Sequence, residues 1–265
     1  MPEGDTLFRT AAGLRPHLVG RRVSGARATR PGPQIERVIG ATVDAVESHG
    51  KNLVIRFDNG LELRTHMRMN GSWHRYRPDE RWRRPPSRAR VVLEVPGAIA
   101  VCFDAPVVEL FEQRAEAVHP TLATLGPDLL DPAFDDAAAA EALRRLRDPA
   151  RSTWPISQAL LDQRALAGIG NIWRNETLFV ERVDPLAPVA SLDDSTLARL
   201  IATARRLLTE SANLAPGRAG VHVYRRSGRP CPRCGTPIRS APLPTEVPRT
   251  TYWCPKCQAP KETHR

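Results

Sequence analysis

The chain has 265 residues, of which 41% are hydrophobic and 26% charged, enough for a sizeable core in a globular, soluble protein of two or more domains. Lys and Arg together number 39 against 29 Asp and Glu, a net charge of +10, which favours a polyanionic partner, with nucleic acid ahead of an anionic membrane surface. No apolar run reaches the length of a membrane span, and the first residues are acidic rather than basic. We therefore expect no secretion signal and a cytoplasmic location.

The N-terminal part is predicted to be a helix followed by a β-sandwich that ends near residue 118. Apolar residues recur at helical spacing up to Gly20, with Pro16 inside the helix. Short β-branched or alternating segments, separated by Gly, Pro and Asn-Gly, then predict strands. These strand segments are 22–28, 41–48, 51–57, 61–67, 90–95 and 98–103. The arginine-rich stretch 75–90 is predicted to be a long loop that is either solvated or in contact with DNA.

Several prolines mark a linker over 119–134, and helical periodicity dominates from Asp135 onward. The helical segments are 137–147, 156–163, 171–183 and 195–211. Gly168 and Gly170 directly precede Asn171 at the start of one of these helices. Such a turn either exposes backbone N–H groups to a phosphate or simply connects two helices.

Four of the five cysteines form two CxxC pairs near the C-terminus, separated by residues 235–253. Two such pairs can surround one tetrahedral Zn²⁺ with four thiolates and leave no open position. We therefore expect one structural zinc ion, held by Cys231, Cys234, Cys254 and Cys257, in a basic β-ribbon that could follow a phosphate backbone. Cys102 is expected to be a buried core thiol.

Two short stretches contain residues that stand out chemically. Pro2 and Glu3 precede the first helix, where proline and an acidic residue also suit a helix start without any further role. Lys51, in HGKNL, is the only lysine before the cysteine pairs in a chain that otherwise uses arginine. Because a compact ammonium group that can also transfer a proton is not interchangeable with a guanidinium, Lys51 is predicted to have a specific role rather than to be a solvated strand end.

In chain order, PEG, HGKNL, LLDQRALAGIGNIWRNETLF, VYRRSGRPCPRCGTPI and RTTYWCPKCQ resemble the formamidopyrimidine-DNA glycosylase and endonuclease VIII family of base-excision repair enzymes. The resemblance covers nearly the whole chain and implies an α+β multidomain fold. Its parts are an N-terminal helix and β-sandwich (1–118), a linker (119–134), a helix-two-turn-helix DNA-binding domain (135–219) and a zinc finger (220–265). Double-stranded damaged DNA is the implied partner of a monomer that needs no small-molecule cofactor.

The resemblance implies that the initiator methionine is removed and that the amine of Pro2 becomes a Schiff-base nucleophile. An α-amino group has a pKa of about 7.7–8.0 against about 10.4 for lysine, so far more of it is the free base at neutral pH. Glu3 would be the proton donor to the opening sugar, which requires a raised pKa. Lys51 would donate a proton in β-elimination and Arg249 in δ-elimination.

The same resemblance implies a set of DNA contacts. Lys51, Asn171 and Arg249 would bind the phosphates that flank the flipped nucleotide, with Gly168 and Gly170 in the loop before Asn171. This grip would offset the unstacking cost of base flipping, a few kcal/mol. The loop RMNGSW aligns with the family's void-filling loop, so Met69 is predicted to be the wedge, with Arg68 and Asn70 beside it.

The substrate branch is predicted from two departures. The strand AIAVCF is followed by DAPVVELFE, without the arginine and phenylalanine of the oxidised-purine glycosylases, and PEG replaces Pro-Glu-Leu. Both favour the endonuclease VIII branch, which mainly removes oxidised pyrimidines. Three alternatives remain: an 8-oxoguanine or formamidopyrimidine glycosylase, as a methionine wedge suggests; a non-catalytic DNA-binding protein on the same scaffold; and a zinc-ribbon accessory protein of transcription or translation.

Overall fold

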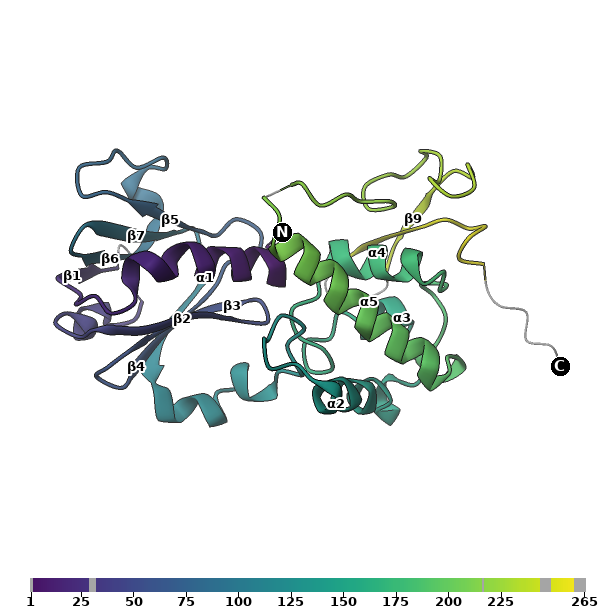
Figure 1. The fold of residues 1–265 in the computed structure, drawn as a ribbon, viewed down its shortest axis with the longest axis horizontal. Coiled ribbons are helices and arrows are strands. Elements are labelled where there is room, and N and C mark those ends of the chain that lie inside the picture. Colours follow the sequence, from purple (N-terminus) through teal and green to yellow (C-terminus); the bar gives the residue numbers. More distant parts are fainter. Residues whose placement is uncertain (1, 29–31, 216, 244–248, 260–265) are drawn as a thin grey trace. The chain divides into compact units, whose positions relative to one another are not determined.

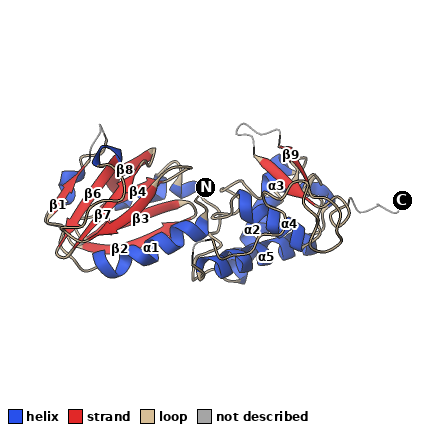
Figure 2. Ribbon diagram, turned by 90° about the horizontal axis from the view of Figure 1, so that it is seen from above, coloured by secondary structure: helices blue, strands red, loops and turns tan. Residues whose placement is uncertain are grey.

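The computed structural model describes residues 2–28, 32–215, 217–243 and 249–259. The chain divides into two compact units, Met1–Thr124 and Leu125–Arg265, the first built mainly of strands and the second mainly of helices (Figures 1 and 2). The division falls inside the predicted linker 119–134. The boundaries predicted after residues 118, 134 and 219 stay predictions.

The first unit is the predicted β-sandwich, and it begins with helix α1 (Gly4–Leu18). One four-stranded sheet has the order β1-β6-β7-β5 and the other β2-β3-β4-β8, and all neighbouring strands are antiparallel. The strands of the first sheet are β1 (Gly25–Arg27), β5 (Ser72–Tyr76), β6 (Ala89–Val95) and β7 (Ala98–Phe103). Those of the second are β2 (Val43–His49), β3 (Asn52–Phe57), β4 (Leu61–His66) and β8 (Val107–Glu112).

The core of this unit lies between the two sheets and under α1. Alternate residues of β3 and β4 face it, among them Ile55 and Leu63, while Leu7 and Leu14 of α1 belong to the same buried cluster. Cys102 of β7 is also fully buried there, and burial raises the pKa of its thiol. Short 3-10 turns complete the unit. They are η1 (Ile35–Val38), η2 (Pro86–Arg88), η3 (Gln113–Val118) and η4 (Leu122–Thr124).

Two strands were not predicted, and both lie at the edge of a sheet. The two buried residues of β5, Trp73 and Tyr76, are three positions apart and so do not follow an every-second-residue pattern. Every residue of β8 keeps some exposure. Neither strand therefore shows the period of two that predicts a half-buried strand. The prediction of a loop over 75–90 was wrong at both ends, because β5 extends to Tyr76 and β6 starts at Ala89.

The described part of the second unit contains four α-helices and a two-stranded ribbon. The helices are α2 (Asp136–Leu146), α3 (Ile156–Ala159), α4 (Asn171–Val180) and α5 (Asp194–Ala212). The ribbon pairs β9 (Arg239–Pro242) with β10 (Thr250–Trp253), and the 3-10 turns are η5 (Pro149–Arg151) and η6 (Val189–Ser191). Asp193 caps α5 by accepting the Thr196 N–H at 2.6 Å. Hydrogen bonds from the Thr196 side chain, from this N–H and from Ser195 lower the pKa of the carboxyl to about 2.

The predicted helix 156–163 is shorter than expected, since α3 ends at Ala159. After Ala159 the backbone tightens into three-residue turns, with Leu161 N–H donating to Gln158 O at 2.9 Å and Asp162 N–H to Ala159 O at 3.2 Å. The Gln163 side chain then donates to Ile169 O and accepts the Gly168 N–H, which connects this segment to the loop before α4. Part of the predicted linker belongs to this unit's core, because Leu129 is fully buried. Among the described residues, no helix is long and apolar enough to cross a bilayer.

Candidate functional site

Pro2 and Glu3 lie at the N-terminus of α1. The Glu3 carbonyl accepts the N–H groups of Thr6 at 3.0 Å and Leu7 at 3.1 Å, which makes Glu3 the N-cap residue. Its side chain is buried, with 1% of the residue exposed, whereas Pro2 is half-buried. The structure therefore places a carboxyl group out of bulk water, one residue after a more accessible proline.

Lys51 occupies the tip of the β2–β3 hairpin. His49 pairs with Asn52, so Gly50 and Lys51 form a two-residue turn, and Gly50 has the positive φ, 58°, that such turns favour. The Asn52 side chain donates to His49 O at 3.0 Å and closes the turn. Lys51 is half-buried on this constrained tip.

Helix α1 brings its first residues close to this tip because it runs antiparallel to β2 (Figure 1). Arg15 donates to Val46 O at 3.0 Å, and Gly20 N donates to Val43 O at 2.8 Å. At ~1.5 Å per helix residue, the start of α1 lies about 16 Å before Arg15. The same length along a strand is about five residues at ~3.3 Å each. Counted along β2 from Val46, the residue beside Arg15, it reaches the Gly50–Lys51 turn.

The predicted wedge is on a tight turn after β4, which we call the Met69 turn (residues 67–71). Gly71 N donates to Met67 O at 2.8 Å, and a Cβ at Gly71 would lie 2.7 Å from Met67 backbone atoms, so only glycine fits there. Arg68 has a φ of 43°. Met67 is 2% exposed and Met69 56%. The turn therefore buries one methionine and presents the other to solvent.

His66 connects this turn to the Lys51 tip. It pairs with Asn52, so the Met69 turn and Lys51 share one end of the sheet. Burial, followed by the charges of Arg64, Lys51 and Arg68, lowers the pKa of His66 to about 4. The neutral ring accepts the Arg68 N–H through Nδ1 at 3.2 Å. No sequence motif pointed to His66, because its role depends on pairing with Asn52 across the sheet.

In the second unit, Gly168 and Gly170 lead into α4 as predicted. Gly168 has a φ of 94°, and a Cβ there would lie 3.1 Å from Asp128 Oδ1. Gly170 is the N-cap of α4, and its carbonyl accepts the Arg174 N–H at 3.0 Å. Gly168 therefore has a conformational reason to be present, apart from any contact with phosphate.

Asn171 lies beside the segment that carries Arg249, although 78 residues separate the two in sequence. The Asn171 side chain donates to Thr250 O at 3.2 Å. Arg174, one turn later on α4, donates to Thr251 Oγ1 at 2.9 Å and to Thr250 O at 3.3 Å. The structure thus places Asn171 against the backbone of Thr250, the residue that follows Arg249.

Helix α4 also buries polar residues that the sequence analysis missed. Asn175 accepts the Tyr252 N–H at 2.9 Å, and Glu176, 1% exposed, accepts backbone N–H groups of residues 222–224. The signal was the polar run Arg174–Thr177 inside an otherwise apolar helix. The partners could not be inferred, because they come from segments 46 or more residues away.

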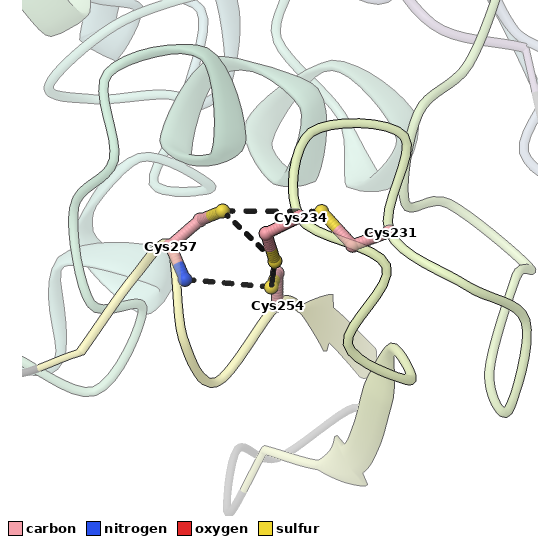
Figure 3. Close-up of side chains that lie close together, drawn as sticks. All are labelled: Cys231, Cys234, Cys254 and Cys257. Atoms are coloured by element: carbon pink, nitrogen blue, oxygen red, sulfur yellow. Dashed lines mark hydrogen bonds between the residues drawn. The ribbon is translucent and has the colours of Figure 1, made fainter.

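The four predicted metal ligands form one cluster (Figure 3). Their Sγ atoms all lie within 4.8 Å of one another. The Sγ atoms of Cys234 and Cys257 are 3.4 Å apart and those of Cys231 and Cys257 3.9 Å. Four thiolates around Zn²⁺ at ~2.3 Å would be about 3.8 Å apart. The cluster is therefore consistent with a zinc finger, and Phe179, Val223 and Ile238 pack against it.

Comparison with known proteins identifies relatives over almost the whole chain. Residues 1–106 match the formamidopyrimidine-DNA glycosylase N-terminal domain, and residues 125–222 match the H2TH domain of the same family. A probable endonuclease 8 2 of Streptomyces coelicolor is 38% identical over 98% of this chain and 94% of its own length. Endonuclease 8 2 of Mycobacterium tuberculosis is 40% identical over 97% of this chain and all of its own.

Two further matches extend this comparison. The DNA-(apurinic or apyrimidinic site) lyase Nei2 of Mycolicibacterium smegmatis is 38% identical over 97% of this chain and 99% of its own length. Among solved structures, Lactococcus lactis formamidopyrimidine DNA glycosylase bound to DNA with an AP site superposes with a TM-score of 0.82 at 22% identity. That match covers 98% of this chain and all of the other, and it establishes the common fold.

Proposed function

We propose a reaction for this protein on the basis of its family: the chain belongs to the formamidopyrimidine-DNA glycosylase family, which includes the endonuclease VIII enzymes. It is a DNA glycosylase and DNA-(apurinic or apyrimidinic site) lyase of base-excision repair. Its substrate is double-stranded DNA with an oxidised base, bound by a monomer in the cytoplasm. The observation that carries the proposal is that Glu3, Lys51 and the Met69 turn lie at one end of the first unit, next to Pro2.

The proposed nucleophile is the Pro2 amine, freed by removal of Met1. Its nitrogen attacks C1′ of the damaged nucleotide, the N-glycosidic bond breaks, and the base leaves with the bonding electrons and the proton that the Pro2 nitrogen loses. Glu3 protonates the sugar ring oxygen as the ring opens. The burial of Glu3 one residue after the nucleophile supports this role, because it keeps the proton donor out of bulk water. The product is an iminium ion between Pro2 and C1′.

The iminium ion acidifies C2′ and so prepares strand cleavage. Loss of the C2′ proton lets the 3′ phosphate leave, and a second elimination releases the 5′ phosphate. Lys51 supplies a proton for the first elimination and Arg249 for the second. A constrained hairpin tip limits where the Lys51 ammonium can go, which supports its assignment.

Phosphate binding in the second unit is assigned to Asn171 and Arg249, with Gly168 and Gly170 shaping the loop before α4. The hydrogen bond from Asn171 to Thr250 O supports a joint role, because it keeps the two residues in one place. One structural Zn²⁺, held by Cys231, Cys234, Cys254 and Cys257, would fix the ribbon that carries Arg249.

The proposed lesions are oxidised pyrimidines, as the likeness to proteins named endonuclease 8 suggests. The exposed Met69 keeps oxidised purines as the second candidate, because a methionine wedge resembles that of the purine enzymes. A non-catalytic protein on this scaffold is the third.

Borohydride trapping separates the three candidates. Duplexes carrying dihydrouracil, 8-oxoguanine or an abasic site are incubated with the protein and reduced, and the adduct is mapped by peptide analysis. A cross-link at Pro2 that is strongest with dihydrouracil is expected. Preference for 8-oxoguanine would keep the mechanism and change the substrate. No adduct on any duplex, while DNA still binds, would leave a binding protein. A control with a tag that blocks the Pro2 amine should lose strand cleavage.

A further inference from the structure

The Met69 turn is held by a hydrogen bond from an arginine that has no part in the proposed reaction. Arg84, in the loop between β5 and β6, donates through Nη1 to Asn70 O at 3.2 Å and to Asp104 Oδ2 at 2.6 Å. The guanidinium therefore bridges the turn that presents Met69 and a carboxylate after β7. This contact comes in addition to the His66 ring, which accepts the Arg68 N–H within the turn itself.

Both Asp104 and the loop that carries Arg84 are themselves held by further contacts. Asp104 also accepts from Arg88 Nε at 2.9 Å, and its own N–H donates to Arg88 O at 3.0 Å. The loop that carries Arg84 is attached to β5, because Arg83 N donates to the Tyr76 hydroxyl at 3.0 Å and Trp82 stacks on the Tyr76 ring with centroids 5.9 Å apart. The Arg84 guanidinium thus reaches Asn70 from a rigid support.

A wedge needs such a support because it is a flexible side chain on a turn without ladder hydrogen bonds. Met69 is exposed, and a methionine side chain has three rotatable bonds. If the backbone beneath it could also move, insertion into DNA would have to order both. Holding Asn70 O restricts the backbone next to Met69 before DNA binds.

We propose that Arg84 is a positioning residue that holds the Met69 turn in the conformation that inserts into DNA, with Asp104 as its anchor. The proposal rests on the proposed function, since it gives Met69 the wedge role. Arg84 acts through Asn70 and Met69 and takes no part in the chemistry at C1′.

The test is a double-mutant cycle with Arg84→Met and Met69→Ala on a dihydrouracil duplex. Arg81→Met is the matched control, because Arg81 lies exposed in the same loop and carries the same charge. The readouts are the single-turnover cleavage rate and the fluorescence of a 2-aminopurine opposite the lesion, which rises when that base is unstacked. Arg84→Met should slow cleavage about tenfold and reduce the fluorescence rise, whereas Arg81→Met should change both less than about threefold.

In the Met69→Ala background, Arg84→Met should have no further effect, since both changes remove the same wedge. Equal losses from Arg84→Met with and without Met69 would overturn the proposal, as would full activity of Met69→Ala. If Arg84→Met lowers the melting temperature, Arg84→Lys is the second variant, because it keeps the charge and a donor and should recover most of the fluorescence rise. Failure to recover it in a folded protein also counts against the proposal. Absence of cleavage in the unsubstituted protein would instead refute the proposed function.

Discussion

Replacement of Glu176 by Gln should loosen the attachment of residues 222–224 to α4. Glu176 Oε2 accepts the His222 N–H at 2.8 Å and the His222 ring at 3.0 Å, while Oε1 accepts the N–H groups of Val223 at 3.0 Å and Tyr224 at 2.9 Å. Glutamine keeps the shape of the side chain and one acceptor oxygen. Its amide N–H₂ then faces the His222 N–H, and the charge that strengthens all of these bonds is lost.

The expected loss in the free energy of unfolding is about 2–4 kcal/mol. The His222 N–H is partly buried, so losing its acceptor costs toward the lower end of the ~1–3 kcal/mol of a buried donor, and hydrogen bonds to a charged acceptor contribute roughly 1.5–3 kcal/mol against about 1 kcal/mol for neutral ones. Because Val223 packs in the same cluster as Cys231 and Cys254, we also expect weaker metal binding by the cysteines.

Urea unfolding followed by far-UV circular dichroism measures the loss, and competition with a chromophoric chelator measures Zn²⁺ affinity. Glu210→Gln is the control, because Glu210 is half exposed and forms only a surface ion pair with Arg206, which is worth at most about 1 kcal/mol. A change of less than about 0.5 kcal/mol in Glu176→Gln would refute the reasoning, since this carboxylate accepts three backbone N–H groups, of which that of Val223 is buried and the other two are partly buried.

Three further outcomes are expected. Cys254→Ser should leave less than one Zn per chain by metal analysis and lower the melting temperature, because only three of the four thiolate ligands remain to bind the metal. Arg249→Ala should weaken DNA binding and reduce the slope of log affinity against log salt by about one, because one phosphate contact is lost. Glu62→Gln should flatten the pH dependence of stability between about pH 4.5 and 7. Burial, followed by the charge of Glu116, raises the pKa of Glu62 in the folded protein to about 7. In this range the folded protein therefore holds a proton that the unfolded chain has lost, and the free energy of unfolding falls as pH rises, by at most about 3 kcal/mol.

Each of these has a contrary result. Full zinc content in Cys254→Ser would remove that cysteine from the ligand set, and an unchanged salt slope in Arg249→Ala would remove Arg249 from the phosphate contacts. Parallel stability curves for Glu62→Gln and the unsubstituted protein between pH 4.5 and 7 would show that Arg56, which donates to Glu62 at 3.0 Å, keeps the carboxyl ionised throughout.

Features that depend on short-range spacing were predictable from the sequence. The two CxxC pairs indicated a metal cluster, because ligand spacing alone limits how four sulfurs can meet. Apolar residues at helical spacing identified α1, α2, α4 and α5, and the strands with buried alternate residues were recognised for the same reason. The motifs in order were sufficient to indicate the family, and the relatives confirm it.

Tertiary structure decided the rest, because it depends on contacts between distant segments. The edge strands β5 and β8 form by pairing with β7 and β4, so their local pattern is weak. Asn171 meets Thr250 and Glu176 meets residues 222–224 only when α4 packs on the ribbon and on the segment after α5. Arg84 reaches Asn70 only through the fold of the loop after β5. A buried polar group must find a partner, but the sequence does not say which residue provides it.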